Sequence, residues 1–303
     1  MLRRLHELKS LPTLPGVGYS EEIRRIEERL EELRERRPSD AAWKVVERAR
    51  HPQRPQTLDI IEHALPDFLE LHGDRVSGDD QAIVGGPATL DGRSVMVIGQ
   101  QKGHDLKERQ RHNFGMARPE GYRKVQRLAR LADKFRMPVV TFVDTPGAFP
   151  GADAEQGGQA GQIARTLQVF AGLSVPTVAV VIGEGGSGGA VALALCDRIY
   201  MLENAVYSVI TPEGCAAILW RDAQEASAAA DALRMTAPDL LALGVIDGVI
   251  PEPRKGAHKA HRATAKKVIR TIEAALRGLE EQTPQARKAA RLTRFLEMGR
   301  YAS

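Results

Sequence analysis

Apolar residues recur at helical spacing along several long stretches of the chain. Between residues 20 and 38 they fall three and four positions apart, which predicts an amphipathic helix. The same spacing, with a proline in the first turn, predicts a helix over residues 119–135. The basic stretch 256–303 also has a helical pattern, which is interrupted at Pro284. We therefore expect helices near both ends of the chain, with the last stretch forming a docking arm.

Short apolar runs rich in β-branched residues predict strands in the middle of the chain. Residues 81–90 and 93–99 form two such runs, and the dipeptide Asp91–Gly92 between them is typical of a β-hairpin. Further strands are expected at residues 139–143, 177–182, 198–202, 206–210 and 245–250. The sheet is therefore expected to begin with an antiparallel pair.

Two of these strands lead into turns rich in glycine and proline, and each turn leads into a helix. Residues 139–143 precede the turn 144–151, and residues 177–182 precede the turn 183–189. Strands joined by such crossovers lie parallel, and their carboxyl ends meet at the edge where α/β proteins bind ligands. We predict that both turns face one cavity.

The second turn matches two known functional motifs that overlap. Residues 183–188 match the dinucleotide fingerprint G-x-G-x-x-G, and residues 185–189 match the nucleophile elbow G-x-S-x-G. A phosphate P-loop is excluded because Ala190 and Val191 stand where Lys and Ser or Thr are needed. Glycines permit positive φ or close approach, and the N–H groups that begin a helix lack intrahelical partners. The turn is therefore suited to hold a negative charge.

Three chemistries compete for this turn. A hydrolase would use Ser187 with a downstream Asp and His, but His258 and His261 lie in the polar tail. A Rossmann-type oxidoreductase would use Glu203, twenty residues after Gly183, as a ribose-binding acid, but its fingerprint belongs in the first strand–helix unit. Acyl chemistry that relies on backbone N–H groups to stabilise an oxyanion needs no such partner. We favour the last and keep the oxidoreductase as the alternative.

A polar segment at residues 102–115 is unusually rich in basic side chains. It is expected to form a long loop, and such loops are often functional. Lys102, Arg109 and Arg111 could hold a phosphate or a carboxylate group, or they could form an ordinary solvated surface.

Composition narrows the class of protein. The 303 residues are 43% hydrophobic and 27% charged, as in soluble globular proteins, and the net charge of +4 gives little support for a nucleic-acid partner. No apolar run is long enough to span a membrane, and no signal-peptide pattern begins the chain, so we expect a cytoplasmic protein. The two cysteines, Cys196 and Cys215, cannot form a four-cysteine zinc site and are expected to be buried thiols.

Six motifs in order along the chain are similar to those of one family. They are Phe68–Arg75, Asn113–Met116, Arg118–Lys124, Asp144–Gly147, Val181–Ala190 and Tyr207–Cys215. Together they resemble the carboxyltransferase α subunits of bacterial and plastid acetyl-CoA carboxylases, from about residue 20 to residue 258.

The resemblance implies both a fold and a reaction. The fold would be α/β and crotonase-like (ClpP/crotonase), a repeated ββα spiral over residues 57–255, with a helical N-terminal arm over 1–56 and a helical C-terminal tail over 256–303. The reaction would transfer a carboxyl group from carboxybiotin, held on a carrier protein, to acetyl-CoA. It would form malonyl-CoA, the first committed step of fatty acid biosynthesis. A catalytically silent crotonase-like scaffold is a further alternative.

The resemblance also suggests roles for the residues of the two turns. Negative charge on the ureido oxygen of biotin would be stabilised by the amides of Gly185 and Gly186, with Ala148 and Phe149 as further donors. Other candidates for binding biotin or acyl-CoA are Gly147, Gly183, Ser187, Gly188, Lys102, Arg109 and Arg111. Ser187 is expected to be a helix N-cap rather than a nucleophile. No metal is expected in this chain.

The implied partners would complete the site. They are a β subunit bearing a zinc ribbon, in an α2β2 heterotetramer, together with biotin carboxyl carrier protein and biotin carboxylase. Two positions depart from the family pattern: residues 154–159 lack the usual arginine, and Phe149 replaces the usual tyrosine. Roles of those two side chains cannot be transferred to this chain.

Overall fold

The chain divides into two units, Met1–Ala41 and Ala42–Ser303. The computed structural model describes residues 23–25 and 40–299. Residues 23–25 are helical, and the rest of the helix predicted over 20–38 lies outside the described residues. The second unit carries all the features that follow.

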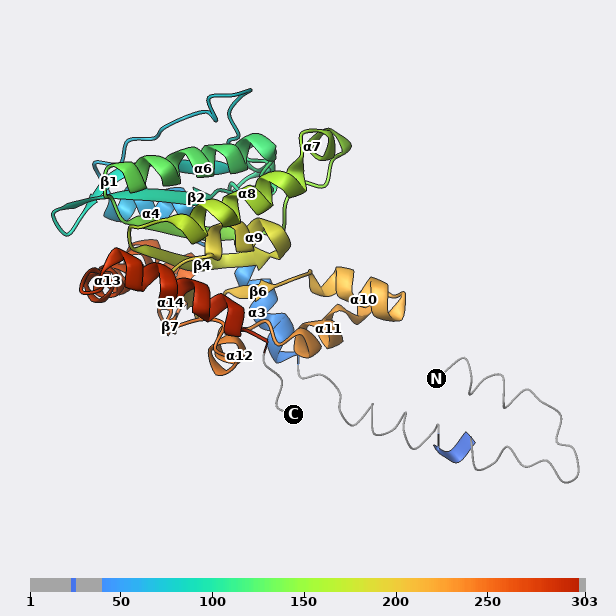
Figure 1. Ribbon diagram of the computed structural model, residues 1–303. Helices are drawn as coiled ribbons and strands as arrows, with labels where there is room; N and C mark the ends of the chain where they lie inside the picture. Colours follow the sequence, from blue (N-terminus) through green and yellow to red (C-terminus); the bar gives the residue numbers. More distant parts are fainter. Residues whose placement is uncertain (1–22, 26–39, 300–303) are drawn as a thin grey trace, which may run out of the picture. The chain divides into compact units, whose positions relative to one another are not determined.

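A mixed seven-stranded sheet forms the centre of the second unit (Figure 1). Its strands are β1 (Ile83–Leu90), β2 (Arg93–Gln100), β3 (Val139–Thr145), β4 (Thr177–Gly186), β5 (Arg198–Leu202), β6 (Val206–Ser208) and β7 (Gly248–Ile250). The order is β1-β2-β3-β4-β5-β7, and β6 pairs with the end of β4. The predicted hairpin is confirmed, because β1 and β2 are antiparallel, while the pairs from β2 onward are parallel.

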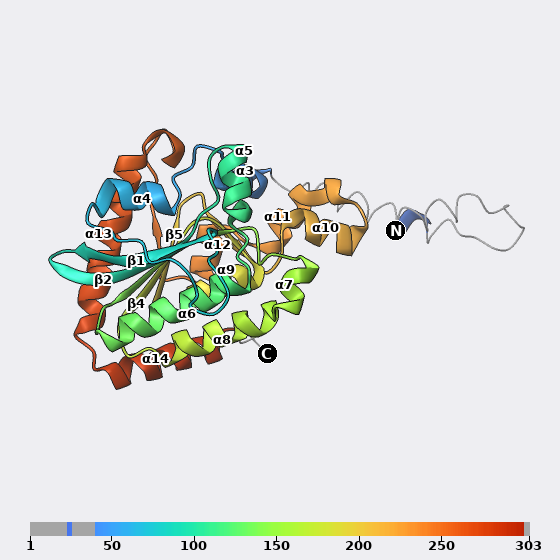
Figure 2. The ribbon, with the colours of Figure 1, turned by 90° about the horizontal axis from the view of Figure 1, so that it is seen from above.

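Helices cover both faces of this sheet. The α-helices from residue 41 onward are α3 (Ala41–Ala49), α4 (Thr57–Ala64), α5 (Leu106–Arg111), α6 (Pro119–Lys134), α7 (Ala152–Gln156), α8 (Gln159–Gly172), α9 (Ser187–Ala194), α10 (Pro212–Trp220), α11 (Ala226–Leu233), α12 (Ala237–Ala242), α13 (His261–Glu280) and α14 (Pro284–Glu297). Helices α6 and α9 lie on one face with α8 packed across them, and α4 and α13 lie on the other (Figures 1 and 2). The middle strands β3 and β4 are buried along their whole length, as expected for parallel strands covered on both faces.

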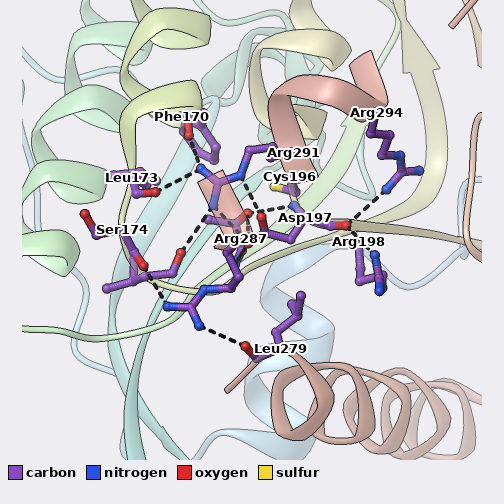
Figure 3. A network of polar contacts seen from close by, with 12 residues as sticks. Phe170, Leu173, Ser174, Cys196, Asp197, Arg198, Leu279, Arg287, Arg291 and Arg294 are labelled. Carbon is purple, nitrogen blue, oxygen red and sulfur yellow. Dashed lines mark hydrogen bonds and ion pairs between the residues drawn. The ribbon is translucent and has the colours of Figure 1, made fainter. Parts of the chain in front are cut away.

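A buried ionic anchor fixes α14 to the amino ends of β4 and β5 (Figure 3). The guanidinium of Arg291 donates to both carboxylate oxygens of Asp197, at 2.8 and 2.9 Å, and also to the backbone carbonyl oxygens of Phe170 and Leu173. Asp197 in turn accepts from the backbone N–H of Thr177 at 2.8 Å. The tail is helical on both sides of Pro284, as predicted, and α14 packs against the rest of the second unit.

The basic segment at residues 102–115 is more ordered than predicted. It contains α5 and a 3-10 turn at 113–115. The carboxylate of Asp105 accepts from the backbone N–H of Glu108 at 2.8 Å, so an N-cap begins a helix where a loop was expected.

Two further expectations can be compared with the structure. Cys196 and Cys215 are both buried free thiols, as predicted. None of the helices in the described ranges is both long and apolar enough to cross a membrane.

Candidate active site

The two turns meet at the carboxyl ends of neighbouring parallel strands, as predicted. A Cβ on Gly186 would lie only 2.1 Å from the carbonyl oxygen of Pro146. A Cβ on Gly189 would lie 2.8 Å from the carbonyl carbon of Gly147 and 2.9 Å from the nitrogen of Ala148. The turn after β3 and the first turn of α9 are therefore in direct contact.

The glycines of the second turn are needed for close approach and not for positive φ. Strand β4 continues through Gly186, and none of the glycines within 183–189 has a positive φ. A Cβ on Gly183 would lie 2.4 Å from a carboxylate oxygen of Asp144, and one on Gly185 would lie 2.8 Å from the ring of Tyr207. Side chains at these positions would separate the backbones that build the site.

Ser187 does not have the predicted N-cap role. The N-cap of α9 is Gly186, and Ser187 is the first helical residue, with a left-handed φ of 53°. Its side chain makes no cap hydrogen bond, and within the described residues its hydroxyl has no partner that could act as a base. The sharp bend at Ser187 resembles an elbow, but nothing in the described part of the chain activates it as a nucleophile.

The candidate amide donors are not equally available. The N–H of Phe149 donates to the carbonyl oxygen of Ala117 at 3.1 Å and is already used. The N–H of Ala148 has no acceptor among the described residues. Gly185 lies within the sheet between β3 and β6, and Gly186 pairs with β6 at its very end.

The first turn of α9 adds backbone donors beside Ala148. Ser187, Gly188 and Gly189 carry the first N–H groups of the helix, which have no intrahelical acceptor. Because Gly189 packs against Ala148, the open donors of both turns lie close together. Such a cluster of N–H groups at a helix N-terminus is suited to a developing negative charge.

A buried ionic network joins the ends of the two strands that lead into the turns. The ammonium of Lys102 lies 2.8 Å from Oδ1 of Asp144, at the end of β3, and 2.7 Å from Oε2 of Glu184, near the end of β4. The backbone N–H of Glu184 donates to Asp144 at 2.9 Å. Lys102 thus joins the two strands that carry the turns.

The charges in this network hold one another ionised. Burial alone would raise the pKa of Glu184, but the charges of Lys102 and Arg50 outweigh it and lower the pKa to about 2. Burial alone would lower the pKa of Lys102, but Asp144 and Glu184 outweigh it and raise the pKa. Glu184 and Lys102 therefore both stay charged at neutral pH.

Arg50 extends the network to the far side of the site. It follows α3, and its guanidinium donates to Glu184 at 2.6 Å and to Glu213, on α10, at 2.5 and 3.2 Å. The chain of charges therefore fixes α3 and α10 beside the end of β4.

The structure brings two of the three basic candidates together. Lys102 and Arg109 both line a cavity of about 240 Å³ beside Pro146. Arg111 lies elsewhere, with its Nε donating to the side chain of Gln81 at 2.6 Å, and it does not line that cavity.

A strained aromatic residue completes the wall of the same cavity. Asn113, Phe114 and Gly115 all have left-handed φ values, of 48°, 55° and 79°. This conformation is costly for a bulky residue, and such strain is concentrated at functional sites. The ring of Phe114 is 41% exposed and lines the cavity with Arg109.

An apolar cavity of about 440 Å³ opens beside α9. Its walls include Ser187, Gly188, Val191, Tyr207, Val209, Leu233, Leu240 and Val245. The backbone at the start of α9 therefore borders a space large enough for a small organic group.

Phe149, which stands where the family usually has tyrosine, packs against Arg118. The guanidinium of Arg118 lies 4.2 Å from the centre of the Phe149 ring and pairs with Asp153 of α7. The described residues include no group of three or more His, Cys, Asp or Glu side chains placed to hold a metal ion.

Sequence reasoning missed the ionic network and Phe114. Asp144 and Glu184 each stand near the end of an apolar strand, so a search for charged residues at strand ends could have found them. Arg50 and Glu213 come from remote elements, and no local pattern marks them.

Comparison with known proteins supports one family. The family described as acetyl co-enzyme A carboxylase carboxyltransferase-like matches residues 1–299. A protein of Thermus thermophilus named acetyl-coenzyme A carboxylase carboxyl transferase subunit alpha is 52% identical over 300 residues, which are 99% of this chain and 96% of that relative. The protein of the same name from Aromatoleum aromaticum is 50% identical, over 98% of this chain and 93% of the relative.

Solved structures with lower identity share the fold. The transcarboxylase 12S structure with hydrolysed methylmalonyl-coenzyme A gives a TM-score of 0.62 at 22% identity, over 81% of this chain and 45% of that one. A Pseudomonas malonate decarboxylase heterotetramer in complex with coenzyme A gives 0.63 at 17% identity, over 78% and 91%. This chain spans less than half of the transcarboxylase chain, and the likeness confirms the predicted crotonase-like α/β fold.

Proposed function

The chain belongs to the family of acetyl-CoA carboxylase carboxyltransferase α subunits, and from this premise we propose how its two turns serve carboxyl transfer. The proposed reaction moves the carboxyl group of carboxybiotin to acetyl-CoA and forms malonyl-CoA. The observation that carries the proposal is the contact between the turn at Ala148 and the first turn of α9, with open N–H donors on both.

The proposed site acts through backbone donors. Carboxybiotin on a carrier protein supplies the activated carboxyl group. The amides of Ala148 and Gly186, with the first N–H groups of α9, stabilise negative charge on the ureido oxygen, and Gly185 holds them in place from within the sheet. One such donor contributes about 2.7–4 kcal/mol to lowering a barrier. The cradle depends on its glycines, because a side chain at Gly186 or Gly189 would clash with the backbone of the turn after β3 and separate the two turns.

Several of the other candidate residues line a cavity near the two turns. Lys102 and Arg109, with Phe114, form a wall that can hold an anionic group. Gly183 lets Asp144 approach β4, and Gly189 lets α9 approach the backbone of Gly147, so these glycines act through backbone geometry. In the reaction we assign no part to Arg111, whose side chain points to Gln81.

A partner subunit is proposed to complete the site. The relatives of this chain are named as alpha subunits, which supports a second subunit that supplies the acyl-CoA side of the site. We propose a zinc-ribbon β subunit in an α2β2 assembly, working with biotin carboxylase and its carrier protein in the cytoplasm. We further propose residues 57–255 as the catalytic domain, with an arm before it and a tail after it.

Reconstitution tests the proposal. This chain would be coexpressed with a zinc-ribbon β subunit, and malonyl-CoA formation from acetyl-CoA and carboxylated carrier protein would be measured. We expect activity from the pair and none from either chain alone. Full activity from this chain alone would refute the half-site proposal, and tight NAD binding with no carboxyl transfer would support an oxidoreductase instead.

A further inference from the structure

Another cavity lies at the carboxyl edge of the sheet, apart from the glycine turns. Its volume is about 340 Å³, and it is bordered by α3, by the turn after β5 and by the segment after β7. None of its lining residues borders the cavities beside α9 and Phe114. We call it the basic pocket, and its polar lining is Arg48, Arg54, Glu203, Asn204, Glu252, Arg254, Lys255 and His258.

In one ion pair of the pocket, the positive and negative charges already neutralise each other. Arg54 and Glu252 are nearly fully buried, and Nη2 of Arg54 lies 2.6 Å from Oε1 of Glu252. Glu252 also accepts from the backbone N–H groups of Asn204 and Ala257, at 3.0 and 3.2 Å. Its carboxylate therefore has little capacity to neutralise further cations.

Arg54 itself keeps a donor for a ligand. Its Nε donates to the carbonyl oxygen of Ile182 at 2.6 Å, and Nη2 is used by Glu252. Among the residues that the structure describes, Nη1 has no partner. A buried guanidinium that two contacts hold in place is thus part of the lining of the pocket, and one of its nitrogens keeps no partner among the described residues.

The rim carries positive charge that the pocket does not balance. Arg254 and Lys255 have no ion pair or hydrogen bond within the described ranges. Arg48 donates to the side-chain oxygen of Asn204 at 3.1 Å, which leaves its charge unpaired by that contact. The lining holds four cationic side chains against two carboxylates, and Glu203 is the second of these.

One of the lining residues, His258, belongs to a pair of stacked imidazoles. The rings of His258 and His51 are stacked with their centroids 4.1 Å apart. Burial, followed by the charges of His51 and Lys259, lowers the pKa of His258. A bound anion would act in the opposite direction and favour the protonated ring.

We propose that the basic pocket binds a small molecule that carries a phosphate monoester. Guanidinium groups suit a phosphate because their N–H donors match its several oxygens, and a dianion would balance the excess charge. The cavity of about 340 Å³ exceeds what a bare phosphate needs, so part of its space, which His258 also lines, is left for the organic portion. This inference is independent of the carboxyltransferase proposal.

The test follows the imidazole of His258 by NMR over a pH titration, with its signal assigned from a His258→Gln variant. Inorganic phosphate, ribose 5-phosphate and ribose would each be added to the full chain. We expect both phosphate-bearing probes to raise the pKa of His258 saturably by about 0.5–1 unit, with ribose 5-phosphate acting at the lower concentration. Absence of a shift with both probes, or an equal shift with ribose, would overturn the proposal.

Two matched double variants exclude nonspecific attraction. Arg254→Gln with Lys255→Gln removes two exposed rim cations and leaves the buried pair intact, so the fold is retained. Lys134→Gln with Lys288→Gln removes the same charge from exposed positions on α6 and α14. We expect at least about tenfold weaker ribose 5-phosphate binding in the first variant and unchanged binding in the second. Equal weakening in both would contradict a built site.

Discussion

The two ends of the central strands each bury a carboxylate, but they use it differently. At the amino end, Asp197 is enclosed by Arg291 and by the backbone of β4, and every donor around it belongs to the fold (Figure 3). At the carboxyl end, Glu184 lies between Lys102 and Arg50, and all three line a cavity. The same kind of ionic contact therefore serves stability at one end and a ligand site at the other.

The difference lies in what surrounds the charges. The remaining N–H groups of Arg291 are used by carbonyl oxygens at the end of helix α8 and in the segment after it, so no donor is left for a ligand. The network of Glu184 borders turns whose amides remain open. Mutations at the amino end should therefore change folding alone, whereas those at the carboxyl end should change turnover as well.

The largest expected effect is at the amino-end anchor. Arg291→Ala leaves Asp197 buried without its cation, and breaking a buried pair in this way costs about 3–5 kcal/mol. Denaturant unfolding should show this loss, while turnover of the folded complex stays near normal. The matched control is Arg277→Ala, which removes an exposed pair with Asp91 and should cost less than about 1 kcal/mol. A large loss of turnover in folded Arg291→Ala complex would contradict the division between the two ends.

The carboxyl-end network should respond to acid and to loss of its lysine. The folded-state pKa of Glu184, about 2, lies below its ordinary value, so its contribution is complete above about pH 4.5 and is lost as the pH falls toward 2. That shift corresponds to roughly 3 kcal/mol. In Lys102→Met the pKa of Glu184 should rise, so acid unfolding should begin at higher pH.

Turnover distinguishes this network from a purely structural one. Lys102→Met should lower both the free energy of unfolding and the turnover of the reconstituted complex, because Lys102 joins the strands that carry both turns. Unchanged turnover with an unchanged acid profile would show that the network does not support the site.

A smaller effect is expected at the strained turn. Phe114→Gly and Phe114→Ala both remove the ring from the cavity wall, but only glycine relieves the left-handed backbone. The glycine variant should therefore be more stable than the alanine variant by about 1 kcal/mol. Both variants should reduce kcat/KM for the carrier-bound substrate to the same extent. Greater stability of the alanine variant would show that the turn is not strained.

Much of the fold followed from local patterns in the sequence. The Asp91–Gly92 hairpin, the proline in the first turn of α6, the interruption of the tail at Pro284 and the two strand–turn–helix units were all predicted and are all present. These features depend on turn chemistry and on periodicity, which neighbouring residues determine.

The features that could not be predicted from the sequence depend on contacts between distant segments. Arginine is usually exposed on the surface of a helix, yet Arg291 is buried against Asp197, 94 positions away. Ser187 was expected to cap α9, but the close approach of the two turns moves the cap to Gly186. Such outcomes follow from packing, which residue spacing does not encode.

The most direct measurement of the central claim compares two glycine variants in the reconstituted complex. Gly186→Ala places a Cβ 2.1 Å from the oxygen of Pro146 and would separate the two turns, whereas Gly161→Ala adds a Cβ in open space on α8. With assembly confirmed by gel filtration, we expect kcat for malonyl-CoA formation to fall about 10²–10³-fold in Gly186→Ala and to stay normal in Gly161→Ala. A Gly186→Ala complex with the turnover of the unaltered one would contradict the claim that these two turns form the oxyanion cradle.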